Sequence, residues 1–238
     1  MNKIKVLIPL LATILLMGCA QVRITGSGNV VTQEEAITGF DQVDISQSFN
    51  VDITQGEDFR VVIRVDDNVV EYLNVIRQGS TLIIGLDPGN SYTIVNATME
   101  AEVTMPELVG LELSGSSVAN LSGFESSKSL VVDLSGNSDL HGDIQAGDSR
   151  FDVSGNSSVT ISGSGGDLTV DASGSSDVDL ADFPGSDGTV DASGSSTVTV
   201  NLSGRLDADA SGSSDVYYLG NPELGSIETS GSSSIRPK

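Results

Sequence analysis

Hydrophobic and polar residues alternate along the second half of the chain in a pattern that occurs seven times. In each copy an acidic residue stands between two positions that are almost always apolar, and a Ser-Gly pair follows. The pairs begin at Ser114, Ser135, Ser154, Ser173, Ser193, Ser211 and Ser230, at spacings of 18 to 21 residues. Alternation with a period of two predicts a strand with one buried face. The acids are therefore expected to point outward.

A second short strand is predicted after each Ser-Gly turn. It begins with an aliphatic residue, in order Val118, Leu140, Val159, Val178, Val198, Val216 and Ile235. The glycine suits a corner that needs a positive φ. One such unit cannot bury its own apolar face, whereas parallel stacking on its neighbours can. We therefore predict an all-β fold, a parallel β-helix (solenoid) with coils of about 19 residues. A propeller blade needs about 40 residues, and a sandwich would not give matching columns in every copy.

The first half of the chain also has the composition of strands but is less regular. Alternation is clear over residues 37–53 and 59–65, and residues 82–84 and 92–105 suggest further strands. The segment 43–48 is similar to 132–137 and is interpreted as a divergent early coil. Residues 66–78 lack alternation, which predicts a short helix or a projecting loop. Since no linker-like stretch separates the halves, one domain over residues 26–238 is expected, with the repeats at 107–238.

The N-terminus has the pattern of an export signal. Lys3 and Lys5 precede an apolar run over residues 6–17, too short for a membrane span. The run ends in Leu16-Met17-Gly18-Cys19, which resembles a bacterial lipobox. We predict a lipoprotein signal peptide at 1–18, lipid attachment at Cys19 and a short tether at 19–25; an ordinary cleaved signal is the alternative. Ala20 favours the outer membrane over the inner, on either its periplasmic face or the cell surface.

Composition excludes several classes of function. The 238 residues carry 33 Asp and Glu against 11 Lys and Arg, a net charge of -22, so the phosphates of a nucleic acid would be repelled. One Cys allows neither an intramolecular disulfide nor a Cys-rich zinc site, and one His allows no site with two imidazoles. The lone His141 is expected on an exposed polar surface.

The acids of the repeats form a column open to a functional interpretation. Its members are Glu112, Asp133, Asp152, Asp171, Asp191, Asp209 and Glu228. The simplest interpretation is a solvated face, with Arg150 and Arg205 as partners of the acids. The alternative is a strip of weak Ca²⁺ sites, because hard oxygen ligands suit that ion. Its candidate ligands are Asp133, Asp152, Asp171, Asp191 and Asp209. The calcium-binding nonapeptide of β-helices is absent, and no other cofactor is expected.

A second polar column follows the turns. It consists of Ser116, Asn137, Asn156, Ser175, Ser195, Ser213 and Ser232. These side chains either satisfy one another or offer hydrogen bonds to a sugar chain lying lengthwise. The sequence does not identify the residues that bind a ligand.

Seven segments of the chain resemble the head GIN domain family. They are Gly26–Val30, Gly39–Val43, Val51–Gly56, Thr81–Ile84, Met105–Leu108, Leu113–Ser116 and Tyr218–Pro222. The family is described as an autotransporter-adhesin head, and its members are mostly secreted or lipoprotein domains. The resemblance implies a right-handed parallel β-helix, and it supplies no catalytic residues to carry over.

These observations favour a non-enzymatic, lipid-anchored envelope protein that presents polar ladders to a protein or glycan ligand. A polysaccharide-acting enzyme is one alternative, because β-helices host such enzymes. Catalysis would need a few acids in an asymmetric pocket with shifted pKa values, whereas these acids are evenly spread. A purely structural envelope component, whose solenoid ends pair head to tail, is the other alternative.

Overall fold

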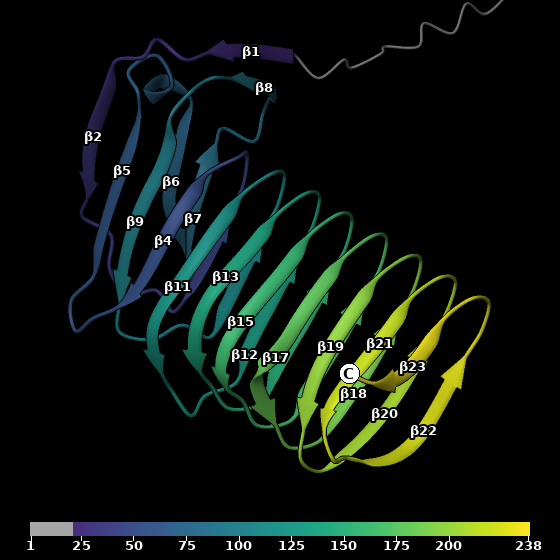
Figure 1. Ribbon diagram of the computed structural model, residues 1–238. Coiled ribbons are helices and arrows are strands. Elements are labelled where there is room, and N and C mark those ends of the chain that lie inside the picture. The colour runs from purple at the N-terminus through teal and green to yellow at the C-terminus, as the bar shows by residue number, and fades with distance from the viewer. Residues whose placement is uncertain (1–20) are drawn as a thin grey trace, which may run out of the picture.

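Two long sheets face each other along most of the molecule, and the chain winds between them as a solenoid (Figure 1). The computed structural model describes residues 21–238. One sheet has ten strands in the order β22-β20-β18-β16-β14-β12-β10-β3-β7-β6. The other has eleven, in the order β2-β5-β9-β4-β11-β13-β15-β17-β19-β21-β23. The predicted stack of parallel coils is confirmed.

Each repeat contributes one strand to each sheet. The ten-stranded sheet receives β10 (Gly110–Leu113), β12 (Leu130–Leu134), β14 (Ser149–Val153), β16 (Leu168–Ala172), β18 (Gly188–Ala192), β20 (Arg205–Ala210) and β22 (Glu223–Thr229). The eleven-stranded sheet receives β11 (Val118–Glu125), β13 (Asp139–Gln145), β15 (Ser158–Ser164), β17 (Asp177–Gly185), β19 (Thr197–Leu202), β21 (Asp215–Gly220) and β23 (Ser234–Pro237). Every neighbouring pair among these strands is parallel.

Corresponding residues of successive coils lie directly over one another. Val132 pairs with Phe151, Phe151 with Val170, and Val170 with Val190. All four are 0–1% exposed, so they fill a shared apolar interior. Burying a side chain of this kind contributes about 1.5–3 kcal/mol. The columns read from the sequence are therefore the rungs of one continuous core.

The backbone ladder continues through the Ser-Gly corner. Gly155 has φ +79°, and a Cβ added there would lie 2.3 Å from the carbonyl oxygen of Gly136. That same carbonyl accepts a hydrogen bond of 2.8 Å from the amide of Asn156. Glycine is thus required both for its backbone conformation and for the close approach of the coil below.

The first coil is built from segments that the sequence places in a divergent early repeat. Strands β3 (Gln42–Ile45) and β4 (Asn50–Gln55) pair in parallel with β10 and β11, and Ile45 lies opposite Leu113. Its corner has Gln47 at φ 56° and Ser48 at φ 68° instead of glycine. The interpretation of this segment as an early coil is confirmed.

Antiparallel strands cover the N-terminal end of the solenoid (Figure 1). In one sheet β5 (Arg60–Asp66) lies between β2 (Val30–Glu35) and β9 (Met99–Met105). In the other, β6 (Leu73–Gln78) pairs with β7 (Thr81–Leu86). The expectation for residues 66–78 is correct in part: a 3₁₀ helix spans Val70–Tyr72, but a paired strand follows it. That strand lacks alternation because its second half is exposed on both faces.

A separate two-stranded sheet lies at the N-terminal end. It joins β1 (Gln21–Thr25) to β8 (Ser91–Val95) in parallel. Residues 21–25 belong to the stretch predicted as a tether, and here they form a paired strand. The signal peptide and Cys19 lie outside the described residues. Within residues 21–238 no helix is long and apolar enough to cross a bilayer.

Candidate functional site

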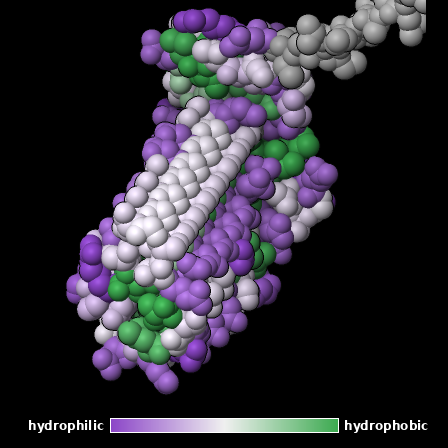
Figure 2. All heavy atoms as spheres, turned by 90° about the vertical axis from the view of Figure 1, so that its right-hand side faces the viewer, coloured by the Kyte–Doolittle hydropathy of each residue, from purple (hydrophilic) through white to green (hydrophobic). Residues whose placement is uncertain are grey.

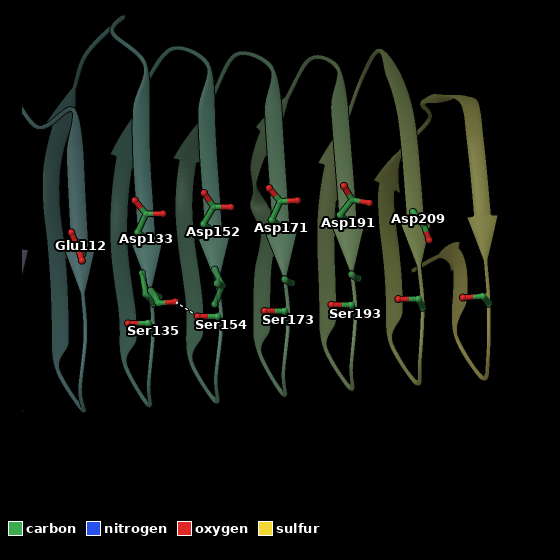
Figure 3. Close-up of a pocket in the computed structure, with 16 residues that line it drawn as sticks. Glu112, Asp133, Ser135, Asp152, Ser154, Asp171, Ser173, Asp191, Ser193 and Asp209 are labelled. Atoms are coloured by element: carbon green, nitrogen blue, oxygen red, sulfur yellow. Dashed lines mark hydrogen bonds between the residues drawn. The ribbon is translucent and has the colours of Figure 1, made fainter. Parts of the chain in front are cut away.

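The acidic column forms a ladder on the outer face of the ten-stranded sheet. Each acid pairs in register with the acid of the next coil, from Glu112 opposite Asp133 to Asp209 opposite Glu228. The side chains point away from the interior, as predicted (Figure 3). Asp44 lies opposite Glu112 and adds a rung that the sequence analysis did not include. Its similarity to the later repeats was the signal that could have found it.

A row of serines runs beside the acids, and the two rows line a lengthwise groove (Figure 3). The serines are Ser135, Ser154, Ser173, Ser193, Ser211 and Ser230, the first residues of the Ser-Gly corners. The groove has a volume of about 660 Å³ and reaches from Glu112 to Ser230. Figure 2 shows a flat stripe of intermediate hydropathy, as serine and glycine have, beside a strongly hydrophilic stripe. The groove can therefore accommodate an extended ligand rather than a compact one.

Arg150 neutralises the middle of the ladder. Its Nε and Nη2 donate to the Asp152 carboxylate at 2.9 and 2.8 Å, and Nη2 also donates to Asp171. The predicted pairing of Arg150 with the acidic column is thus confirmed. Arg205 pairs instead with Asp207, which belongs to a different column from the ladder acid Asp209.

The end of the ladder next to the N-terminal cap has no such partner in the described part of the chain. Partial burial raises the pKa of Asp44, and burial followed by the Asp44 charge raises the pKa of Glu112. Burial and then the Asp152 charge raise the pKa of Asp133. These three carboxyl groups occupy successive rungs. The ladder is uniform in spacing but not in charge compensation.

The remaining predicted sites are dispersed. His141 is exposed on β13, beside Asn120 of one coil and Thr160 of the next. Among residues 21–238 no group of three or more His, Cys, Asp or Glu is arranged to hold a metal ion. The five acids proposed for Ca²⁺ are brought into one row, at one acid per coil.

A buried serine column was missed by the sequence analysis. It comprises Ser117, Ser138, Ser157, Ser176, Ser196 and Ser214, which are 0–2% exposed. Where a hydroxyl is buried it needs a hydrogen-bond partner, and Ser176 Oγ donates to the carbonyl oxygen of Ser173 at 2.6 Å. The available signal was that a serine occupies the fourth position of every Ser-Gly turn. The column holds the corner in shape beneath the exposed serines.

Fold and groove together define a β-solenoid protein with an extended, polar and acidic face. The chain belongs to the family described as "Putative auto-transporter adhesin, head GIN domain", whose model matches residues 39–222. The family resemblance read from the sequence is thereby confirmed. No curated protein matches the chain in sequence.

Solved structures share the fold at low sequence identity. A crystal structure named as a putative adhesin from Bacteroides fragilis has a TM-score of 0.83 at 18% identity, covering 90% of this chain and 100% of that one. One named as a putative lipid binding protein from Parabacteroides distasonis has a TM-score of 0.66 at 23% identity, with 91% and 100% coverage. A putative adhesin from Parabacteroides merdae has a TM-score of 0.63 at 15% identity, with 91% and 99% coverage.

Proposed function

We propose that the chain is a non-enzymatic envelope protein, anchored by lipid at Cys19, whose groove binds an extended ligand. The lengthwise groove between the acid and serine ladders carries this proposal. Ionised carboxylates only accept hydrogen bonds, so the ligand must present donors along its length. A neutral or amino-bearing glycan and a basic peptide segment both do so, whereas an acidic polymer would be repelled by the charge of -22. The family's adhesin description supports an extracellular or envelope role.

Binding to immobilised glycans and basic peptides tests the groove. Asp133→Asn with Asp191→Asn removes two ladder charges that have no ion pair among the described residues. We expect the double variant to bind at least about tenfold more weakly, since charge-assisted hydrogen bonds are the strong ones. The matched control, Asp139→Asn with Asp177→Asn, removes the same charge from the opposite sheet and should bind normally. Equal losses in both variants, or no binding by the wild type, would contradict the proposal.

The lipid anchor has its own test. Replacing Cys19 by Ser should abolish incorporation of labelled palmitate and release the protein from the membrane fraction, because acyl chains provide about 0.8 kcal/mol per buried CH₂. Surface proteolysis of intact cells then distinguishes the periplasmic face from the cell surface. A C19S variant that stays in the membrane fraction would exclude this mode of attachment.

One observation favours the enzymatic alternative. The pKa values are raised on the three successive rungs Asp44, Glu112 and Asp133, as well as at Asp171, and shifted pKa values are typical of acid–base catalysis. An enzyme would act at this end of the groove, with Glu112 as the proton donor. Turnover of a neutral polysaccharide by the wild type that is lost in Glu112→Gln would establish it. Binding without turnover supports the adhesin.

Weak Ca²⁺ binding along Asp133, Asp152, Asp171, Asp191 and Asp209 stays a separate prediction. With one carboxylate per coil, adjacent rungs would have to share an ion. Calorimetry that detects no heat attributable to these acids with millimolar Ca²⁺ would remove it.

A further inference from the structure

The N-terminal cap contains a buried carboxylate without a counter-charge. Asp66 ends strand β5 and is 1% exposed. Its Oδ1 is buried and has no hydrogen-bond partner among the described residues. Its Oδ2 accepts one long hydrogen bond, 3.4 Å from the amide of Gly28. Burying a carboxylate costs several kcal/mol unless it is paired, so this group needs an explanation.

A backbone carbonyl oxygen lies beside the Asp66 carboxylate. A Cβ added at Gly26 would lie 2.1 Å from Asp66 Oδ2 and 2.2 Å from the carbonyl oxygen of Asn96, so both oxygens crowd the same side of Gly26. The next residue, Asp67, is already engaged: Ser27 Oγ donates to it at 2.6 Å, and Asn29 Nδ2 at 2.7 Å. Within residues 21–238 no Lys or Arg forms an ion pair with either aspartate.

A half-buried carboxylate provides a contrast. Asp41 also has one buried oxygen without a hydrogen bond. Lys128, however, lies close enough that its pKa is raised first by the hydrogen bond to Glu107 and further by the charge of Asp41. A protein cation thus lies near Asp41, whereas no ion pair reaches Asp66 among residues 21–238 and its Oδ2 accepts only the long hydrogen bond from Gly28.

We propose that Asp66 and the carbonyl oxygen of Asn96 bind a Ca²⁺ ion. Carboxylate and carbonyl oxygens are ligands that this hard cation takes, and the ion would supply the counter-charge that the buried Asp66 carboxylate lacks among the described residues. The ion would fasten the segment that follows β8, at Asn96, to the end of β5, beside the loop of residues 26–29. Because the acid ladder is on the outer face of the repeats, this site is independent of the proposed ligand groove.

Calcium titration of the full-length chain, purified in detergent and stripped with chelator, tests the site. We expect one ion per chain whose binding depends on Asp66, with Kd on the order of 10⁻⁴–10⁻³ M, the range of extracellular calcium modules. At 10 mM Ca²⁺ the Tm should rise by about 3–8 °C. Asp66→Asn should abolish the rise, whereas Asp41→Asn and the ladder variant Asp133→Asn should retain it. An Asp66→Asn variant with an undiminished rise would overturn the proposal.

Hydrogen exchange of the wild type gives an answer even where Asp66→Asn fails to fold. Calcium should slow exchange at residues 26–29, 66–68 and 96–98 and leave the repeat strands unchanged. Slowing confined to β10–β22 would place the ion on the ladder and overturn the proposal. The absence of any calcium effect on exchange or on the Tm would also overturn it.

Discussion

The repeats and the N-terminal cap solve the same problem, covering an apolar interior, by different means. In the repeats each strand lies between two near copies of itself, so one choice of residue is reused on every rung. In the cap, antiparallel strands of unlike sequence close the end of the stack. The first coil belongs to both regions. It has the parallel register of the repeats but different residues at the corner, and this is where the two solutions can be compared most directly.

The largest expected effect compares the buried residue at the corner of the first coil, an aromatic side chain, with the buried serine at the corners of the repeats. Phe49 is fully buried at the place where the next coil has Ser117: the amide of Val118 donates to the carbonyl of Phe49, and that of Asp139 to the carbonyl of Ser117. Phe49→Ser would restore the residue of the repeats. It should nevertheless lower the free energy of unfolding by about 3–5 kcal/mol, because a large cavity remains. Chemical denaturation measures the loss.

The matched variant in the repeats is Ser176→Ala. It removes a hydroxyl that donates at 2.6 Å to Ser173 but creates almost no cavity. We expect a loss of about 1 kcal/mol, and no measurable change for the exposed neighbour Ser175→Ala. If Phe49→Ser costs no more than Ser176→Ala, the two corners are filled equivalently, and the distinction between cap and repeat fails.

The corner backbone provides the next comparison. Gly155→Ala forces a Cβ against the Gly136 carbonyl, 2.3 Å away, at a φ of +79°. Left-handed backbone alone costs about 1–2 kcal/mol, and overpacking adds about 1–3. Ser48 has φ 68° without glycine, so Ser48→Gly should be neutral or stabilising by up to about 1 kcal/mol. Thermal unfolding of both variants checks the opposite signs, and a destabilised Ser48→Gly would contradict this account.

This contrast also explains what could be predicted from the sequence. A column that recurs in every coil, such as Asp133, Asp152 and Asp171, identifies the strand, its pairing register and the face of the sheet on which the side chains lie. The fold and the ladder were therefore predictable. The cap has no internal copies. Strand β6 pairs antiparallel on an edge and lacks alternation, so its strand state depends on contacts distant in sequence. The carboxylate of Asp66 is likewise buried by segments 26–29 and 95–98, which no local pattern links to it.

A smaller effect concerns pH and the ladder. The folded-state pKa values of Asp44, Glu112, Asp133 and Asp171 are raised, chiefly by burial. Between their ordinary values near 4 and the raised values the folded chain binds more protons than the unfolded chain. The free energy of unfolding therefore falls as pH rises through that window. We expect the Tm to be higher near pH 4.5 than at pH 7, and Asp133→Asn to flatten this slope.

At more acidic pH the free energy of unfolding should instead rise with pH. Hydrogen bonds from Arg205 and from the amide of Ser226 lower the pKa of Asp207 to about 2. Its contribution is present above the ordinary value near 4 and is lost as pH falls toward 2. The stability profile should therefore have a maximum at about pH 4–5. A Tm that rises steadily from pH 4 to pH 7 would show that folding does not perturb the ladder carboxyl groups.

The smallest expected effect tests whether charge compensation distinguishes the cap end of the ladder from its middle. Val131 pairs in register with Arg150 and is 42% exposed, so Val131→Arg would place a guanidinium beside Asp133 as Arg150 is placed beside Asp152. Exposed pairs contribute about 0.2–1 kcal/mol. We expect Val131→Arg to stabilise and Arg150→Gln to destabilise by amounts in this range, with both effects shrinking in 1 M salt. NMR titration should show a lower pKa for Asp133 in Val131→Arg. An unchanged Asp133 would mean that burial alone, rather than the missing arginine, sets the cap end of the ladder apart.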